Sequence, residues 1–158
     1  MEGMINLLCA FGGTVGFSIL YNIDKCFYPL CGLTGMVGWG AYLLAIPHCS
    51  GAVSTLIGAL VVVFMSRILS IWKKCPITVF LIAGIFPLIP GSSIYYAAYH
   101  FAIGEYSEAA MMGIEAVKCS FAIVAGIHLN DAVPAKIFQK DYWRDRFGKT
   151  SGHLQDKN

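Results

Sequence analysis

The chain has 158 residues, of which 57% are hydrophobic and 13% are charged, and its formal net charge is +2. This composition excludes an ordinary soluble domain and predicts an integral membrane protein. No Asp, Glu, Lys or Arg occurs between Lys25 and Arg67 or between Lys74 and Glu105. Each of these stretches is long enough for a membrane-spanning helix, which needs roughly 20 consecutive uncharged, mostly apolar residues. The expected fold is all-α and multi-pass, in the cell membrane.

Five apolar segments follow one another along the chain, at about residues 4–21, 31–47, 51–72, 76–103 and 109–130. The first is expected to be a true span and not a cleaved signal peptide, because residues 1–6 contain Glu2 and no basic residue. A four-span arrangement would require a re-entrant segment, since the uncharged run after Lys25 is too long for one crossing. We therefore predict five transmembrane helices.

The basic residues set the predicted orientation. With the N-terminus outside and the C-terminus in the cytoplasm, every Lys and Arg except Lys118, which is inside the fifth segment, lies on the cytoplasmic side, as the positive-inside rule requires. These residues are Lys25, Arg67, Lys73, Lys74, Lys136, Lys140, Arg144, Arg146, Lys149 and Lys157. Residues 1–134 are predicted to form a transmembrane helical domain, and residues 135–158 a basic cytoplasmic tail that contacts anionic lipid headgroups.

Small residues recur in the first three segments. They are Gly12 and Gly16, then Gly32, Gly35, Gly38 and Gly40, then Ser54 and Gly58. Such spacing lets helices approach closely, because lipid provides no hydrophobic drive between them. We interpret the pattern as helix packing; a hinge at residues 35–40 is the alternative.

The fourth segment is predicted to be a broken helix. It contains the run Pro87-Leu88-Ile89-Pro90-Gly91, in which each proline removes a backbone donor and clashes with the carbonyl four residues earlier. Non-helical backbone at membrane depth survives only inside protein or against a water-filled cavity, and such breaks mark transport sites. The helix is expected to restart at about Ser92 or Ser93, either of which can act as the N-cap.

A restarted helix presents free amides and the positive end of its dipole, which favour a carboxylate or phosphate of a bound solute. Three tyrosines that follow the break each add a hydroxyl. The predicted substrate-binding residues are Pro87, Pro90, Gly91, Ser92, Ser93, Tyr95, Tyr96 and Tyr99. A proline kink resealed by neighbouring serines is the alternative, and composition alone does not separate the two interpretations.

The fifth segment contains two ionisable residues, Glu115 and Lys118, within a predicted span. Such residues are costly in lipid and indicate function by default. Glu115 and Lys118 are neighbours on one helix face, and Glu108 lies on the same face, so the three are expected to form a polar stripe facing the bundle. A buried carboxylate there would carry a coupling proton, because burial raises its pKa. A structural Glu115–Lys118 pair is the alternative.

The run from Ala83 to Tyr95, followed by Gly104-Glu105-Tyr106-Ser107-Glu108 and by Gly126-Ile127, closely resembles the short-subunit half of the threonine/serine exporter family of the ThrE type. Residues 16–22 are similar to the first span of that half, and the resemblance covers most of the chain up to Leu129. In this family, short members are split into two polypeptides that work together. The resemblance therefore implies a complementary membrane subunit and small carboxylate-bearing substrates: threonine, serine or a dicarboxylate such as succinate.

The leading hypothesis is a membrane subunit of a secondary exporter, working by antiport with protons. The sequence contains no nucleotide-binding loop that would suggest the use of ATP. No enzyme activity is expected. No metal or other cofactor is expected either, because the six cysteines form no C-x-x-C pair and have no histidine at ligand spacing. The expected partners are the complementary subunit, the lipid bilayer, the substrate and a second copy of the chain, and no nucleic acid.

Two alternatives remain open at this point. The first is a non-transporting subunit that stabilises or assembles the complex. The second is a membrane enzyme acting on a lipid-linked substrate, with Ser92 or Ser93 as nucleophile and His48 or His100 as its base. The serines lack a nucleophile-elbow pattern, and the sequence places no histidine to act on them.

Overall fold

The computed structural model describes residues 2–131, and within this range every regular element is a helix. The elements are α1 (Glu2–Leu20), the short 3-10 helix η1 (Lys25–Phe27), α2 (Tyr28–Ala45), α3 (Gly51–Lys73), α4 (Thr78–Ile85), the 3-10 helix η2 (Phe86–Leu88), α5 (Gly91–Ala102) and α6 (Tyr106–Asp131). The all-α fold predicted from composition is confirmed. The tail predicted at residues 135–158 lies outside the described residues.

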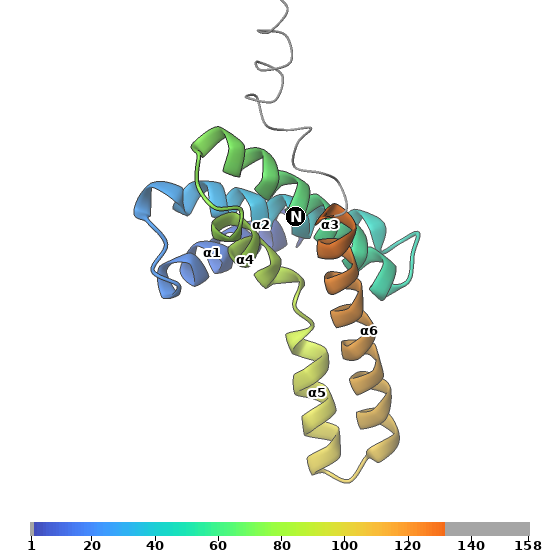
Figure 1. Ribbon diagram of the computed structural model, residues 1–158. Helices are drawn as coiled ribbons and strands as arrows, with labels where there is room; N and C mark the ends of the chain where they lie inside the picture. The colour runs from blue at the N-terminus through green and yellow to red at the C-terminus, as the bar shows by residue number, and fades with distance from the viewer. Residues whose placement is uncertain (1, 132–158) are drawn as a thin grey trace, which may run out of the picture.

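Helices α1 to α4 form a bundle, and α5 and α6 form a hairpin that extends from it (Figure 1). Helix α2 packs against α1, α3 and α4 and so lies at the centre of the bundle. Helix α6 contacts both α3 and α5, and α5 contains no buried residue. The C-terminal part of α6 therefore joins the bundle, while its N-terminal part accompanies α5 away from it.

Three helical stretches are long and apolar enough to cross a membrane: Gly3–Leu20 in α1, Gly51–Lys73, and Tyr106–Leu129 in α6. The pair Thr78–Leu88 and Gly91–Ala102 passes the same test as one span bent by 45°. Helix α2 is not among them, so the described residues contain three helices that could span a membrane, or four if the bent pair is one span. The protein is thus a membrane protein, and the five-span count and the orientation stay predictions.

Glycines allow the helices of the bundle to touch at their backbones. A Cβ at Gly58 would lie 3.1 Å from the carbonyl oxygen of Gly38, and one at Gly84 would lie 2.8 Å from Thr34. The packing interpretation is confirmed at Gly38 and Gly58. It is wrong for Gly12 and Gly16, where a Cβ would meet nothing within 4 Å, because this face of α1 is turned away from the bundle.

The buried polar residues are all serines and threonines that bond within their own helix. The Thr14 hydroxyl donates to the Ala10 carbonyl at 2.7 Å, and the Ser66 hydroxyl donates to the Val62 carbonyl at 2.7 Å. Bonding to the carbonyl four residues earlier satisfies a hydroxyl without a second helix. These side chains can therefore lie in a core that excludes water, as a membrane bundle requires.

Candidate functional site

The helix break lies at the proline run, as predicted. Helix α4 ends at Ile85, η2 continues to Leu88, and α5 begins at Gly91. Pro90 occupies the N-cap position and no side-chain capping hydrogen bond forms there. The expectation that Ser92 or Ser93 caps the restart is therefore wrong, because the helix starts early enough to place both serines inside its first turn.

The break leaves backbone donors near the start of α5. The Gly91 amide donates to the Ile89 carbonyl at 2.7 Å, and the first helical bond runs from the Ile94 amide to the Pro90 carbonyl at 3.1 Å. The amides of Ser92 and Ser93 precede that bond, so helix geometry directs them out of the helix end. Together with the helix dipole they form a weakly positive site.

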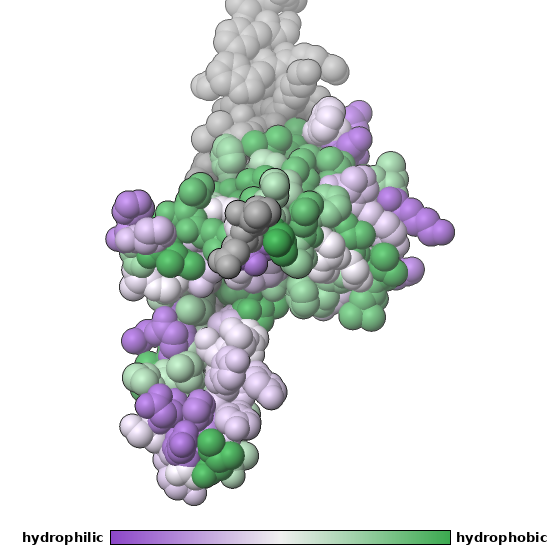
Figure 2. All heavy atoms as spheres, turned by 180° about the vertical axis from the view of Figure 1, so that it is seen from behind, coloured by the Kyte–Doolittle hydropathy of each residue, from purple (hydrophilic) through white to green (hydrophobic). Residues whose placement is uncertain are grey.

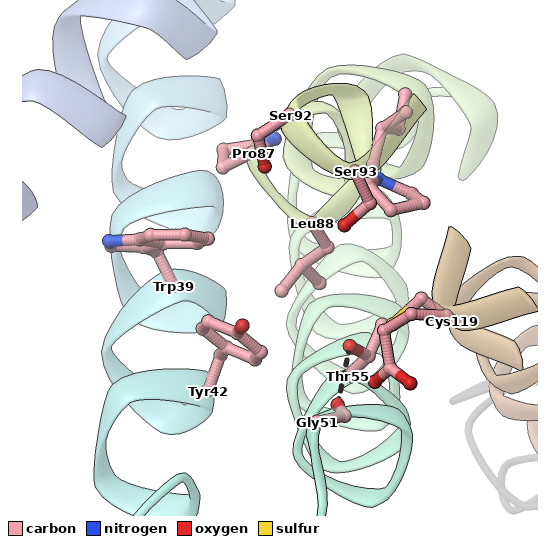
Figure 3. A pocket seen from close by; sticks show the side chains of 12 residues that line it. Trp39, Tyr42, Gly51, Thr55, Pro87, Leu88, Ser92, Ser93 and Cys119 are labelled. Atoms are coloured by element: carbon pink, nitrogen blue, oxygen red, sulfur yellow. Dashed lines mark hydrogen bonds between the residues drawn. The ribbon is translucent and has the colours of Figure 1, made fainter. Parts of the chain in front are cut away.

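A cavity of about 200 Å³ joins the break to three other helices. Figure 3 shows Trp39 and Tyr42 on α2, across from Cys119 on α6, with Thr55 of α3 and the two serines of α5 completing the surround. The lining residues are Trp39, Tyr42, Gly51, Thr55, Pro87, Leu88, Ile89, Pro90, Ser92, Ser93, Glu115 and Cys119. The break and Glu115, which lie in different predicted spans, therefore line one cavity.

Glu115 lies beside the first turn of α3. Its Oε1 atom is 2.9 Å from the position that a Cβ on Gly51 would occupy, so glycine at this position leaves room for the carboxylate. Its Oε2 atom is 3.9 Å from Nζ of Lys118. The start of α3 carries partial positive charge, and its N-cap residue Ser50 makes no side-chain capping hydrogen bond. The carboxylate thus lies between a helix N-terminus and a lysine.

The predicted polar stripe of Glu108, Glu115 and Lys118 does not face the bundle along its whole length. Glu108 and Lys118 are exposed and outside the cavity lining. Glu108 lies in the part of α6 that extends beyond the bundle with α5, whereas Lys118 lies on a different side of α6 from its neighbour Cys119, which does line the cavity. The side chain of Glu115 is itself 44% exposed, so the chain alone does not bury the carboxylate as expected. Of the three residues predicted to couple ions, only Glu115 reaches the cavity.

The predicted substrate-binding residues divide into two groups. Pro87, Pro90, Ser92 and Ser93 line the cavity. The remaining residues are exposed and do not line it: Gly91, Tyr95, Tyr96 and Tyr99. The tyrosines are 65%, 51% and 50% exposed, respectively, because α5 packs only against α6 along this stretch.

Sequence reasoning missed seven of the twelve lining residues: Trp39, Tyr42, Gly51, Thr55, Leu88, Ile89 and Cys119. Trp39 and Tyr42 stack with their ring centroids 4.8 Å apart. Their spacing of three residues on a glycine-rich helix was a signal that they share one face. Nothing in the sequence showed that this face meets the proline break, since that contact depends on how α2 and η2 pack.

The histidines are not placed to activate the serines. His100 lies eight residues after Ser92, or about 12 Å along the helix axis, and its Nδ1 atom is 2.7 Å from Oε2 of Glu105. His48 is exposed in the turn before α3 and does not line the cavity. Within residues 2–131, no group of three or more His, Cys, Asp or Glu is placed to hold a metal ion.

A protein-family model described as "Threonine/Serine exporter, ThrE" matches residues 6–133. The chain belongs to the threonine/serine exporter family. The match includes the proline-glycine run and every residue that lines the cavity, so the resemblance inferred from that run is confirmed. The threonine/serine exporters are a transporter family, which argues for transport and against an enzyme. No curated protein and no solved structure is similar enough to this chain to count as a match.

Proposed function

We propose that the chain is a membrane subunit of a secondary exporter that moves a small amino acid, threonine or serine, out of the cell in exchange for protons. The cavity in which the helix break and Glu115 share one lining is the observation that carries this proposal. Family membership supports the substrate class. Within residues 2–131, neither His48 nor His100 is placed to act on Ser92 or Ser93, which gives the alternative enzyme no support.

The cavity offers different partners for the two charged ends of an amino acid. The outward-directed amides at Ser92 and Ser93 suit the substrate carboxylate. Glu115 suits the substrate ammonium group, and the hydroxyls of Tyr42 and Thr55 suit a side-chain hydroxyl. A dicarboxylate such as succinate would place a second negative charge against ionised Glu115. We therefore favour threonine or serine over a dicarboxylate.

The size of the cavity fits this substrate class. Drug-sized ligands occupy pockets of roughly 300–1,000 Å³, whereas this cavity measures about 200 Å³. Such a space accepts a solute with few non-hydrogen atoms. A lipid-linked substrate would not fit inside it.

Glu115 is the proposed proton carrier. A substrate ammonium group and a proton compete for the same carboxylate, so release of one favours binding of the other. This competition would couple outward movement of the substrate to inward movement of a proton. When neither substrate nor proton is bound, Lys118 would stabilise the negative charge of the Glu115 carboxylate, from which its Nζ atom is 3.9 Å away.

A partner subunit is proposed to cover the α5–α6 hairpin. The Glu115–Lys118 pair and the tyrosines of α5 are exposed, and Figure 2 shows hydrophilic side chains gathered over the hairpin, whereas the bundle is mostly hydrophobic. Ionisable side chains exposed to lipid are costly, so protein is the expected cover at this depth. The complementary half of a split exporter would provide it, and a second copy of the chain is the other candidate.

The test is substrate counterflow in vesicles that contain the chain and its partner. Labelled threonine or serine should exchange across the membrane, and a change of external pH should alter the rate. Glu115→Gln replaces the carboxylate with an amide of similar shape, so exchange should lose its pH dependence. Glu108→Gln is the matched control, because Glu108 lies on the same helix outside the cavity.

Three outcomes would overturn parts of the proposal. Absence of counterflow with both amino acids would remove the exporter function. If Glu115→Gln kept the wild-type pH dependence, Glu115 would be structural and not the proton carrier. If counterflow needed the chain but was insensitive to Ser92→Ala, Ser93→Ala and Glu115→Gln, the chain would be a stabilising subunit and the partner would contain the path.

A further inference from the structure

A second cavity lies between α1 and the helix break. It measures about 190 Å³ and is lined by Asn6, Cys9 and Ala10 of α1 together with Trp39 and Pro87. Trp39 and Pro87 also line the cavity that contains Glu115. The indole of Trp39 and the ring of Pro87 therefore form a wall between two spaces of nearly equal size.

Of the two side chains in this wall, Trp39 is the one that can move. Pro87 is fixed by its ring within η2, whereas the indole turns about two side-chain torsions. Trp39 is only partly buried and packs at the edge of the core cluster that contains Val62 and Leu88. Stacking on Tyr42, with a centroid distance of 4.8 Å, holds the observed position.

The second cavity is also suited to a small polar solute. The Asn6 carboxamide can both donate and accept a hydrogen bond, so it can contact either end of an amino acid. Among the residues that the structure describes, none that lines this cavity is charged, in contrast to the cavity that contains Glu115. A solute would thus be bound tightly next to Glu115 and weakly next to Asn6, which suits entry on one side and release on the other.

We propose that Trp39 is a gate between two stations for the same small solute, and that rotation of its indole joins the two cavities into one passage past the proline break. The biological role of the gate rests on the proposed transport function. Its existence is argued only from the residues that line the two cavities. This inference assigns a role to Trp39 and a second binding station to the surface around Asn6.

Two native cysteines mark the two stations, because Cys9 lines the cavity at Asn6 and Cys119 lines the cavity at Glu115. The experiment uses two full-length variants that keep one of these cysteines, with the other five replaced by alanine. A charged methanethiosulfonate reagent is added to right-side-out or inside-out membrane vesicles that contain the chain and its partner. The rate of modification is measured with Trp39 intact and after Trp39→Ala.

From the side that modifies Cys9, we expect slow modification of Cys119 when Trp39 is present. Trp39→Ala should accelerate modification of Cys119 by up to about tenfold, because loss of an aromatic stacking contact shifts an equilibrium by up to that factor. Trp39→Phe keeps a ring against Tyr42 and should give an intermediate rate. Trp72→Ala is the matched control, since Trp72 is 71% exposed and lines neither cavity.

An unchanged rate at Cys119 in both Trp39 variants, with Cys9 still modified at the wild-type rate, would overturn the gate. If Trp39→Ala did not fold, Trp39→Phe would provide the same comparison. Modification does not depend on transport, so the two proposals fail separately. If Cys119 is modified at the expected rates but no amino-acid counterflow occurs, the exporter function is rejected and the gate is retained. If counterflow occurs but the modification rate of Cys119 is the same with and without Trp39, only the gate is rejected.

Discussion

Gly58 on α3 allows α2, α3 and the proline break to meet. A Cβ at this position would lie 2.9 Å from Cδ2 of Leu88 and 3.1 Å from the carbonyl oxygen of Gly38. The carbonyl belongs to the backbone of α2, so restoring an ordinary 3.4 Å contact (3.4 − 3.1) requires the two helices to part by about 0.3 Å. Leu88 is only 5% exposed within its core cluster and has little space to turn away.

Gly58→Ala should therefore destabilise the bundle. Overpacking of this kind costs roughly 1–3 kcal/mol, while the higher helix propensity of alanine offsets about 1 kcal/mol. Gly16→Ala is the matched control, because nothing lies within 4 Å of a Cβ there. Propensity cancels in the comparison, so Gly58→Ala should be less stable than Gly16→Ala by about 1–3 kcal/mol. Equilibrium unfolding in mixed micelles, followed by circular dichroism, measures the difference, and equal stabilities would refute the reasoning.

Three further predictions concern the site and the topology. The added methyl group of Gly51→Ala meets only the flexible end of Glu115, so the free energy of unfolding should change by less than about 0.5 kcal/mol. Because the carboxylate is displaced, substrate exchange should lose its pH dependence. Retained pH dependence would argue against a coupling role for Glu115 beside Gly51. Gly91→Ala meets nothing within 4 Å, so an unchanged unfolding midpoint with slower counterflow would support a hinge there, and an unchanged rate would exclude it. Cys49 and Cys75 flank opposite ends of α3, so impermeant maleimide should reach them from opposite sides of the membrane. Burial raises the pKa of the Cys75 thiol, so its labelling should accelerate with rising pH as the thiolate forms; labelling of both cysteines from one side would contradict a spanning α3.

Several features of the fold were predictable because they depend on local chemistry. The uncharged runs predicted membrane helices, and the two prolines predicted a break in the fourth segment, which the structure shows between α4 and α5. These effects act within a few residues of their cause: a missing amide, a fixed torsion, an absent charge. The helix restarts at Gly91, slightly earlier than the expected Ser92 or Ser93, because Pro90 can itself occupy the N-cap position. Neither serine is then the N-cap.

Sequence by itself established a membrane protein with a broken helix, and it singled out Glu115 as an ionisable residue that needs an explanation. Only the tertiary structure decided which groups meet. It placed Glu115 and the break on one cavity, left Glu108 and the tyrosines of α5 outside it, and placed Trp39 and Pro87 on the lining of both cavities. The physical reason is that these contacts depend on how closely helices approach, which glycines such as Gly38 and Gly58 set between elements distant in the chain.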